Sequence, residues 1–393
     1  ELCRIYTSGG EARPAEVVGF REAQTLLMPF AELAGIEPGS FVEASGSLTT
    51  IPVGEGVLGR VLDGLGRPID GRGPLRGVRR CPISRASPRP LSRGRISQAL
   101  PTGVRAIDAA LTCGKGQRVG IFSASGVGKS TLLGMIARGA ASDVNVIALI
   151  GERGREVNEF IERDLGKALE HSVVVVSTSD EPALVRLKGA WVATTIAEYF
   201  RDQGKDVALL MDSVTRFAMA QREIGLAIGE PPALKGYVPS VFALLPKLME
   251  RAGTSARGTI TAFYTVLVES DDLTEPVSDT SLSILDGHVI LQRQLAAENH
   301  YPAIDILSSI SRVMVTIAER PHLEAANRLR QVIATYRNAR DLVDIGAYVQ
   351  GSNPEIDYAL KMMPVVNAFL RQVPDELSDF AETLTRLRAM FTP

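Results

Sequence analysis

The nine residues Ser123-Ala-Ser-Gly-Val-Gly-Lys-Ser-Thr131 decide the fold of this 393-residue chain. They follow the apolar run 119–122 and lead into the apolar segment 132–137, which gives the order strand, loop and helix. Gly126 and Gly128 let the backbone turn with its N–H groups facing inward, and these donors converge with the positive end of the helix that follows. The stretch therefore predicts a loop that binds the phosphates of a nucleotide.

The side chains of this loop indicate how the ligand is held. Lys129 supplies a mobile cation for the outer phosphates, and Ser130 offers a hydroxyl to Mg²⁺. The usual pattern has Gly where this chain has Ser123, but the spacing of the other positions is kept. The alternative is a glycine-rich turn that caps an ordinary helix. We expect the nucleotide-binding positions of the loop to be Ser125, Gly126, Val127, Gly128, Lys129, Ser130 and Thr131.

Apolar runs after Gln117 alternate with segments typical of helices. Near-continuous apolar strands separated by helices of about 12 residues or more are typical of a parallel sheet covered on both faces. In such sheets ligands bind at the carboxyl ends of the strands, which is where the phosphate loop lies. The chain is therefore predicted to be an α/β protein, with strands over 119–122, 144–150, 173–176, 207–211 and 260–268.

The two ends of the chain differ from this core. Short strand-like runs before residue 50, broken by Gly and Pro, favour a small β-barrel or sandwich, and residues 51–97 have the composition of turns and linkers. From Pro321 onward, apolar residues recur at helical spacing. The strand-like runs are 15–20, 24–29 and 39–44, and the expected helices lie near 323–336, 353–373 and 375–390. We predict three domains, a barrel-like one over 1–52, the nucleotide-binding core over 53–319 and a helical one over 320–393.

Composition narrows the class of protein. With 43 basic and 45 acidic residues, the whole chain has no strong field that favours nucleic acid or an anionic membrane. The basic stretch Arg76–Arg95 has no interleaved aromatic residues, so we interpret it as a solvated linker rather than a polyanion site. Cys3, Cys81 and Cys113 are too far apart to indicate disulfides or zinc. We expect a soluble cytosolic protein, and because Glu1 falls in a strand-like pattern we expect an N-terminal piece to be missing, which truncates the barrel.

Two carboxylates follow strand runs at places where chemistry on a γ-phosphate needs them. Asp212 ends the run 207–211, as expected of a group that holds Mg²⁺, partly through water. Glu152 follows the run that ends at Ile150, and hydrolysis requires a group that orients water. However, an Asp at a strand end is also a common helix cap. The charged block with Glu152 and Glu156 is equally typical of a solvated first turn of a helix.

Several blocks together resemble the catalytic subunits of the rotary-ATPase superfamily. They are residues 125–131, 151–156, 212–218, 239–246, 283–291 and 301–312. Within that superfamily, residues 221–232 and 345–357 resemble most closely the ATPases of bacterial flagellar and type III protein export. The likeness extends over nearly the whole chain. It implies a RecA-like core that binds and hydrolyses ATP with Mg²⁺.

The resemblance also assigns roles to single positions. Glu152 stands where the family has the glutamate that activates the attacking water, and Arg153 and Arg216 stand where it has phosphate-contacting arginines. Arg312 takes the place of the arginine finger that reaches a neighbouring subunit's nucleotide, although on its own it is typical of a surface or capping residue. The implied contacts to the nucleotide include Glu156, Asp212, Tyr301 and Tyr348, with Tyr301 packing on adenine, and the implied Mg²⁺ ligands are Ser130 and Asp212.

A site shared between subunits implies a homohexameric ring. The resemblance implies a motor whose ATP hydrolysis supports chaperone release, unfolding and export of proteins. It would work in the cytoplasm, at the inner face of the bacterial cytoplasmic membrane, in contact with membrane-embedded export machinery. The implied partners are a stator-like regulator, a central stalk protein, an export gate, chaperones and export substrates, with no specific nucleic acid.

Three alternatives remain open at this point. A catalytic subunit of an F-type or V-type rotary ATPase would couple to ions, but those enzymes divide the finger and the water-activating group between different chains. A nucleic-acid translocase of the transcription-termination type needs an N-terminal RNA surface, yet residues 1–50 offer only Arg4, Arg13 and Arg21 as cations. A non-catalytic ring subunit usually lacks the activating carboxylate, whereas Glu152 is present.

Overall fold

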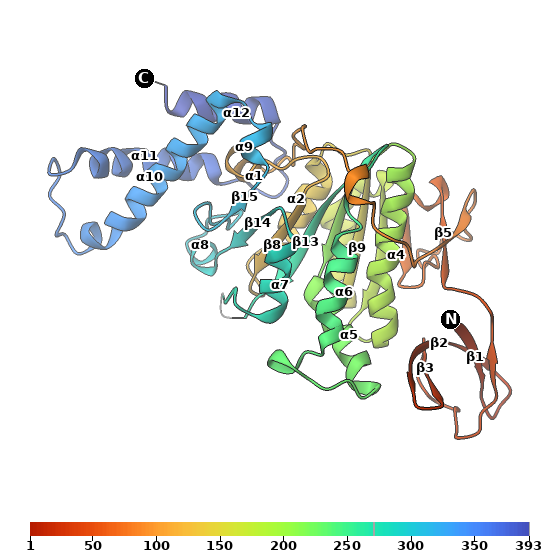
Figure 1. The fold of residues 1–393 in the computed structure, drawn as a ribbon. Coiled ribbons are helices and arrows are strands. Elements are labelled where there is room, and N and C mark those ends of the chain that lie inside the picture. The colour runs from red at the N-terminus through yellow and green to blue at the C-terminus, as the bar shows by residue number, and fades with distance from the viewer. Residues whose placement is uncertain (270–271, 393) are drawn as a thin grey trace.

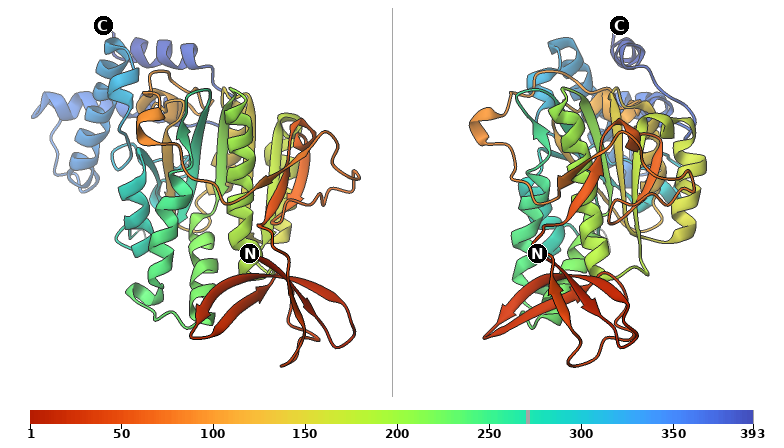
Figure 2. Two further views of the ribbon diagram at one scale, coloured as in Figure 1. Left: turned by 45° about the vertical axis from the view of Figure 1, so that its right-hand side comes forward. Right: turned by 90° about the vertical axis from the view of Figure 1, so that its right-hand side faces the viewer.

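The computed structural model describes residues 1–269 and 272–392 and has three parts (Figure 1). A four-stranded antiparallel sheet comes first, a nine-stranded, mostly parallel sheet with helices on both faces follows, and a group of helices ends the chain. The first and last parts lie at opposite ends of the molecule (Figure 2). The α/β class, the N-terminal β domain and the C-terminal helical domain are therefore confirmed.

The N-terminal sheet has the strand order β3-β2-β1-β4, with all neighbours antiparallel. Its buried face includes Cys3, Ile5 and Ala15. An ion pair of 2.6 Å between Glu16 and Lys188 joins it to the core. The strand β1 lies where the strand-like pattern at Glu1 was noted without predicted bounds, and the other three strands overlap the predicted runs. The strands are β1 (Leu2–Tyr6), β2 (Ala12–Arg21), β3 (Gln24–Pro29) and β4 (Val42–Ala44).

The large sheet has the order β15-β14-β8-β13-β11-β9-β10-β6, and β12 pairs with β13. All five predicted runs are strands in it. The strand β6 lies in the segment predicted as linker. It was missed because it has only four residues and is surrounded by glycines and prolines. The strands β5 and β7 form a separate two-stranded sheet nearby. The strands are β5 (Thr50–Val53), β6 (Arg60–Asp63), β7 (Arg79–Pro82), β8 (Arg118–Ser123), β9 (Val144–Glu152), β10 (Ser172–Thr178), β11 (Asp206–Asp212), β12 (Gly253–Thr254), β13 (Thr259–Leu267), β14 (Gly287–Leu291) and β15 (Ile310–Ser311).

Helices cover both faces of this sheet and create two cores. In β9, Val146 and Ala148 belong to the core on one face, and Ile147 and Leu149 belong to the core on the other, as the alternation of a buried strand requires. One face is covered by α1 (Arg105–Ala110), α2 (Lys129–Gly139) and α3 (Gly154–Glu159). The other is covered by α4 (Ala183–Asp202), α5 (Val214–Ala227), α6 (Pro239–Met249) and α7 (Pro276–Ile284). Shorter helical segments are 55–57, 90–92, 160–165, 166–171, 234–236, α8 (Arg293–Ala297) and α9 (Met314–Ile317).

The C-terminal part contains α10 (Arg320–Asp344), α11 (Pro354–Leu370) and α12 (Phe380–Met390). The helix α12 begins at Phe380 rather than at the predicted residue 375, because the Asp379 carboxylate accepts a 2.9 Å hydrogen bond from the Glu382 N–H and caps the helix there. Residues 371–379 form instead a non-helical segment, which we call the strap. In the described part of the chain, no helix is long and apolar enough to cross a membrane.

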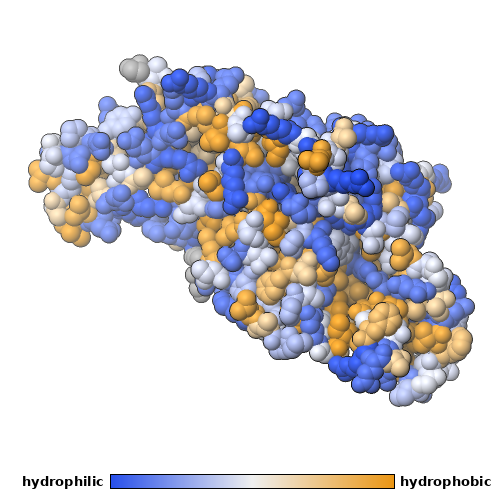
Figure 3. All heavy atoms as spheres, in the orientation of Figure 1, coloured by the Kyte–Doolittle hydropathy of each residue, from blue (hydrophilic) through white to orange (hydrophobic). Residues whose placement is uncertain are grey.

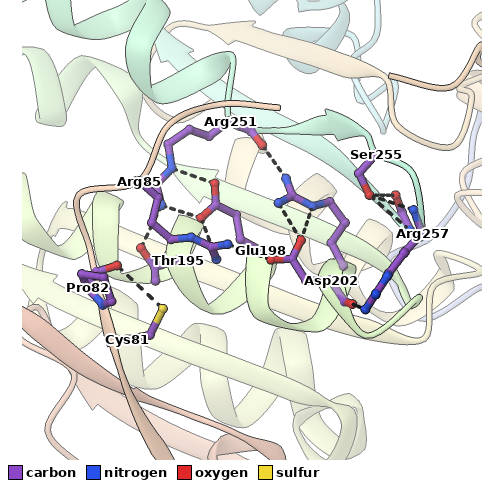
Figure 4. A network of polar contacts seen from close by, with 11 residues as sticks. Cys81, Pro82, Arg85, Thr195, Glu198, Asp202, Arg251, Ser255 and Arg257 are labelled. Carbon is purple, nitrogen blue, oxygen red and sulfur yellow. Dashed lines mark hydrogen bonds and ion pairs between the residues drawn. The ribbon is translucent and has the colours of Figure 1, made fainter. Parts of the chain in front are cut away.

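The basic stretch is fastened to the core by a buried charge network (Figure 4). Arg251 and Glu198 are each 1% exposed and form a two-pronged contact of 2.8 and 2.7 Å. Arg85 of the basic stretch lies 3.3 Å from Glu198 and 2.8 Å from Asp202. At this point the stretch is therefore bound to α4 rather than freely solvated.

Candidate active site

The phosphate loop has the backbone that its glycines predict. Gly126 and Gly128 have φ values of 81° and 97°, a region that other residues rarely adopt. The helix α2 begins at Lys129 immediately after them. Backbone N–H groups and the positive end of an 11-residue helix therefore face the same space, where an anion is stabilised.

Three charged side chains meet beside this loop. Lys129 starts α2, Glu152 ends β9 and Asp212 ends β11, and β9 and β11 are neighbouring parallel strands. The Lys129 ammonium forms a close ion pair with Asp212 and lies 3.6 Å from Oε1 of Glu152. Burial alone would lower the pKa of Lys129, but the two facing carboxylates outweigh burial and raise it. The lysine therefore stays charged.

Glu152 has the environment of a proton acceptor. Burial, and then repulsion by the Asp212 carboxylate, raise its pKa to about 7, although Lys129 opposes the change. Its buried Oε1 has no hydrogen-bond partner within the residues that the structure describes. A carboxyl group that titrates near neutrality with a free buried oxygen is suited to orient water or accept its proton.

Asp212 and Ser130 carry oxygen atoms of the kind that bind a hard cation. Asp212 is 3% exposed, and its Oδ1 accepts a 2.8 Å hydrogen bond from the Thr265 hydroxyl. Ser130 is exposed at the start of α2. Mg²⁺ binds to few protein oxygens and keeps waters and substrate phosphates as its other ligands. This donor set, with the free oxygen of Glu152 nearby, fits that ion.

Arg216 lies against Gly151, the residue before Glu152. Gly151 has a φ of 69°, and a Cβ added to it would lie 2.9 Å from the Cβ of Arg216. The buried Nε of Arg216 is without a hydrogen-bond partner among residues 1–269 and 272–392. With Ser125 of the phosphate loop, Arg216 lines a cavity of about 580 Å³. Its guanidinium is thus available to an anion next to the loop.

The remaining residues of the charged block lie differently. The Arg153 side chain is 82% exposed, and its guanidinium is 3.8 Å from the Glu156 carboxylate. Since successive side chains at a strand end point in opposite directions, Glu152 turns toward Lys129 and Arg153 turns away. The structure does not bring Arg153 to the phosphate loop, whereas Glu156 is close enough to Glu152 to help raise its pKa, after burial and Asp212.

A second cavity, of about 490 Å³, opens on the other side of the loop. Tyr301 lines it, and the tyrosine ring is in contact range of the phosphate loop, because a Cβ added to Gly128 would lie 3.7 Å from it. The strap forms the facing wall, a feature that no local sequence signal indicated. The wall residues are Arg371, Gln372, Val373, Pro374 and Glu376, and the loop and its helix contribute Val127, Gly128, Thr131, Leu132 and Met135.

The structure does not bring Tyr348 to the cavity beside Tyr301. Tyr348 lies between α10 and α11, in a loop that projects away from the sheet (Figure 1). Its hydroxyl is 2.9 Å from Oδ1 of Asp357 and 3.0 Å from the carbonyl of Asn353, and Tyr348 is not among the residues that line the cavity.

Arg312 follows the edge strand β15 and is exposed. Its N–H bonds the Asp286 carbonyl at 3.0 Å, and Asp286 also bonds Arg118, the first residue of β8. The phosphate loop follows Ser123, the last residue of β8, five residues or about 17 Å along that strand. Arg312 therefore lies at the opposite end of the sheet from the loop of its own chain.

Two family models match this chain. The model described as "ATP synthase alpha/beta family, nucleotide-binding domain" matches residues 103–311. The model described as "T3SS EscN ATPase C-terminal domain" matches residues 318–389. The phosphate loop, Glu152, Asp212 and Tyr301 lie within the first match, and the strap lies within the second.

Similar proteins occur in two export systems. The chain is 55% identical over 393 residues to the flagellum-specific ATP synthase of Bacillus subtilis, with 99% of this chain and 90% of the relative covered. It is 52% identical over 392 residues to the type 3 secretion system ATPase of Xanthomonas euvesicatoria, with 99% and 89% covered.

The fold is shared with solved structures. The assembled ATPase EscN from the type III secretion system of enteropathogenic E. coli superposes with a TM-score of 0.94 at 49% identity, covering 98% of this chain and 94% of that one. EscN in complex with its central stalk EscO gives a TM-score of 0.91 at 48% identity, with the same coverage.

Proposed function

This chain belongs to the flagellar and type III secretion ATPases of the ATP synthase alpha/beta family, and on that basis we propose how its residues hydrolyse ATP. The cluster of Lys129, Glu152 and Asp212 beside the phosphate loop carries the proposal. The loop holds the triphosphate, and Lys129 neutralises the outer phosphates. Glu152 orients a water for in-line attack on the γ-phosphorus and accepts its proton.

The polar groups around this cluster complete the proposed site. Ser130 and Asp212 would hold Mg²⁺, which supplies charge neutralisation on the β- and γ-phosphates when bound. The Arg216 guanidinium has an unpaired buried Nε among the described residues and an Nη1 contact of 3.8 Å to the Met219 sulfur. It would stabilise charge that develops on the transferred group. The cavity beside Tyr301 receives the adenine base, with the ring of Tyr301 against one side of it.

We also propose that the active form is a homohexameric ring. Arg312 is exposed and too far from its own phosphate loop to serve it, so a neighbouring subunit must bring this arginine to the nucleotide. An arginine finger contributes about 10³ to 10⁵ in rate in related phosphoryl-transfer enzymes. A lone protomer then lacks one group of its site.

In the cell the ring would act at the membrane-embedded export apparatus, where hydrolysis supports the release, unfolding and export of proteins. The proposed partners are a central stalk protein, a stator-like regulator, an export gate, chaperones and export substrates. The end of α10 and the loop after it support contacts of this kind, since Leu342, Ile345 and Val349 are 48%, 75% and 70% exposed. Apolar colour marks the same projecting end of the molecule (Figure 3).

Two substitutions test the chemistry. Glu152→Gln removes the proton acceptor but keeps the size of the side chain, so we expect ATP to bind normally and kcat to fall about 10²- to 10⁴-fold. Lys129→Ala removes the phosphate contact, so both binding and turnover should fall. Titration of ATP binding beside steady-state hydrolysis separates the two effects.

Glu159→Gln is the matched control, because Glu159 is an exposed glutamate on α3 that pairs only with Arg155 in the described part of the chain. It should hydrolyse ATP at the normal rate. Near-normal turnover of Glu152→Gln would remove Glu152 from the proposed role.

A further inference from the structure

The base cavity is built from two parts of the chain. Tyr301 and the phosphate loop belong to the large α/β domain, whereas the facing wall is the strap between α11 and α12. A short non-helical segment has many conformations unless other groups hold it. What fixes the strap therefore also determines whether the cavity has its second wall.

Gln372 is the residue that fastens the strap most completely. It is 3% exposed, and its N–H bonds the carbonyl of Tyr301 at 2.9 Å, so it is tied directly to the aromatic residue on the opposite wall. Its Oε1 accepts a 2.8 Å hydrogen bond from the Arg105 N–H. Its Nε2 donates to the carbonyls of Gly103 and Glu376 at 2.8 and 2.7 Å.

Arg105 extends this attachment along the strap. It is 3% exposed, and its Nη1 donates to the carbonyls of Phe369 and Arg371 at 3.0 and 3.1 Å. It also pairs with the Glu376 carboxylate. The backbone N–H of Arg105 also bonds the Gln372 side chain. Arg105, the first residue of α1, therefore holds the strap through both its backbone N–H and its guanidinium.

We propose that Gln372 is a positioning residue for the nucleotide base. It keeps the strap in place as the second wall of the cavity, and through the strap it couples base binding to the C-terminal helices α11 and α12. The inference rests on the proposed function, which places the base in this cavity. Without the Gln372 amide, the strap must become ordered when the base binds, and binding is weakened by that conformational entropy.

This role predicts a selective effect on ligands that carry a base. Gln372→Ala should raise the Kd of ADP about tenfold, because several buried hydrogen bonds that order the wall are lost. Pyrophosphate has no base to occupy the cavity that the strap lines, so its Kd should not change. We would measure both constants with the full chain, as inhibition of ATP hydrolysis and by calorimetry.

Three further variants make the result decisive. Gln331→Ala makes the same change at an exposed position of α10 and should leave both dissociation constants unaltered. Tyr301→Ala should weaken the binding of ADP but not that of pyrophosphate. If Tyr301→Ala leaves ADP binding intact, the assignment of the cavity to the base fails. If Gln372→Ala does not fold, Arg138→Gln is the second test. It removes the 2.6 Å hydrogen bond to the strap carbonyl of Pro374, together with a close hydrogen bond to the Asp164 carbonyl, and it should weaken ADP by about threefold.

The proposal is overturned if Tyr301→Ala weakens ADP while the folded strap variants leave the ratio of the ADP and pyrophosphate constants unchanged. It is equally overturned if Gln372→Ala weakens both ligands by the same factor, because that result indicates a general structural role.

Discussion

Glu152 carries the pH dependence that the site geometry predicts. Its carboxyl group is buried beside Asp212, and together these raise its pKa to about 7. Only the deprotonated form can accept a proton from water. Because the pKa is raised, protonation near neutrality removes the active form, and activity must fall as the pH drops.

We therefore expect kcat/KM for ATP to decrease about tenfold per pH unit once the pH is well below 7, and to level off above pH 8. Steady-state rates between pH 5.5 and 8.5 measure this, with thermal unfolding at each pH as the control for loss of structure. The residual activity of Glu152→Gln should lack this acidic limb. A flat wild-type profile over the range contradicts the role.

Residues with a local signal could be predicted, and residues that act through distant contacts could not. Gly126, Lys129 and Asp212 follow from the order of strand, loop and helix. Gly151 and Gln372 did not emerge, since their importance depends on the close approach of Arg216 and on hydrogen bonds to Arg105, both remote in sequence.

At the scale of elements, α10 is attached to the segment 302–311, which connects Tyr301 of the base cavity to Arg312. Arg330 donates to the carbonyls of Ala110, Ser309 and Ile306 at 3.0, 3.2 and 2.5 Å. Two turns further along α10, Arg337 pairs with the buried Asp305 at 2.8 Å. These contacts attach α10 to the segment at two places along the helix.

Arg330→Ala should lower the free energy of unfolding by about 2 kcal/mol, since it leaves buried carbonyls without a donor. Arg340→Ala on the same helix is the matched control. Arg340 and Glu298 are both 39% exposed, so loss of this pair should change stability by less than about 1 kcal/mol. Urea unfolding followed by circular dichroism compares the two variants, and equal losses would argue against the attachment.

The elements themselves were predicted unevenly. The buried parallel strands were found because an apolar run needs no partner to be recognised. The strand β6 and the start of α12 were missed, since the first is four residues long among glycines and prolines and the second is set by the Asp379 cap. The strap was missed for a similar reason, because its conformation is imposed by the α/β domain.

At the scale of the whole molecule, the separation of Glu152 from Arg312 predicts that sites form only between protomers. Glu152 lies at the carboxyl end of the sheet, and Arg312 lies at the amino end of β14 and β8. A protomer with one defect can therefore form a complete site with a neighbour that has the other defect. No such rescue is possible if each chain uses its own arginine.

Mixing two inactive variants tests this arrangement. Glu152→Gln and Arg312→Ala should each lose nearly all turnover as pure rings. In rings assembled at random from equal amounts, about a quarter of the junctions join an intact Glu152 to an intact Arg312, and activity should return to about that fraction of the wild-type value. The measurement is ATP hydrolysis after co-assembly, at the total protein concentration of each pure variant. Ring formation of every sample is verified by sedimentation, because loss of assembly also abolishes turnover. If well-formed mixed rings stay as inactive as the pure variants, Arg312 does not complete a neighbour's site.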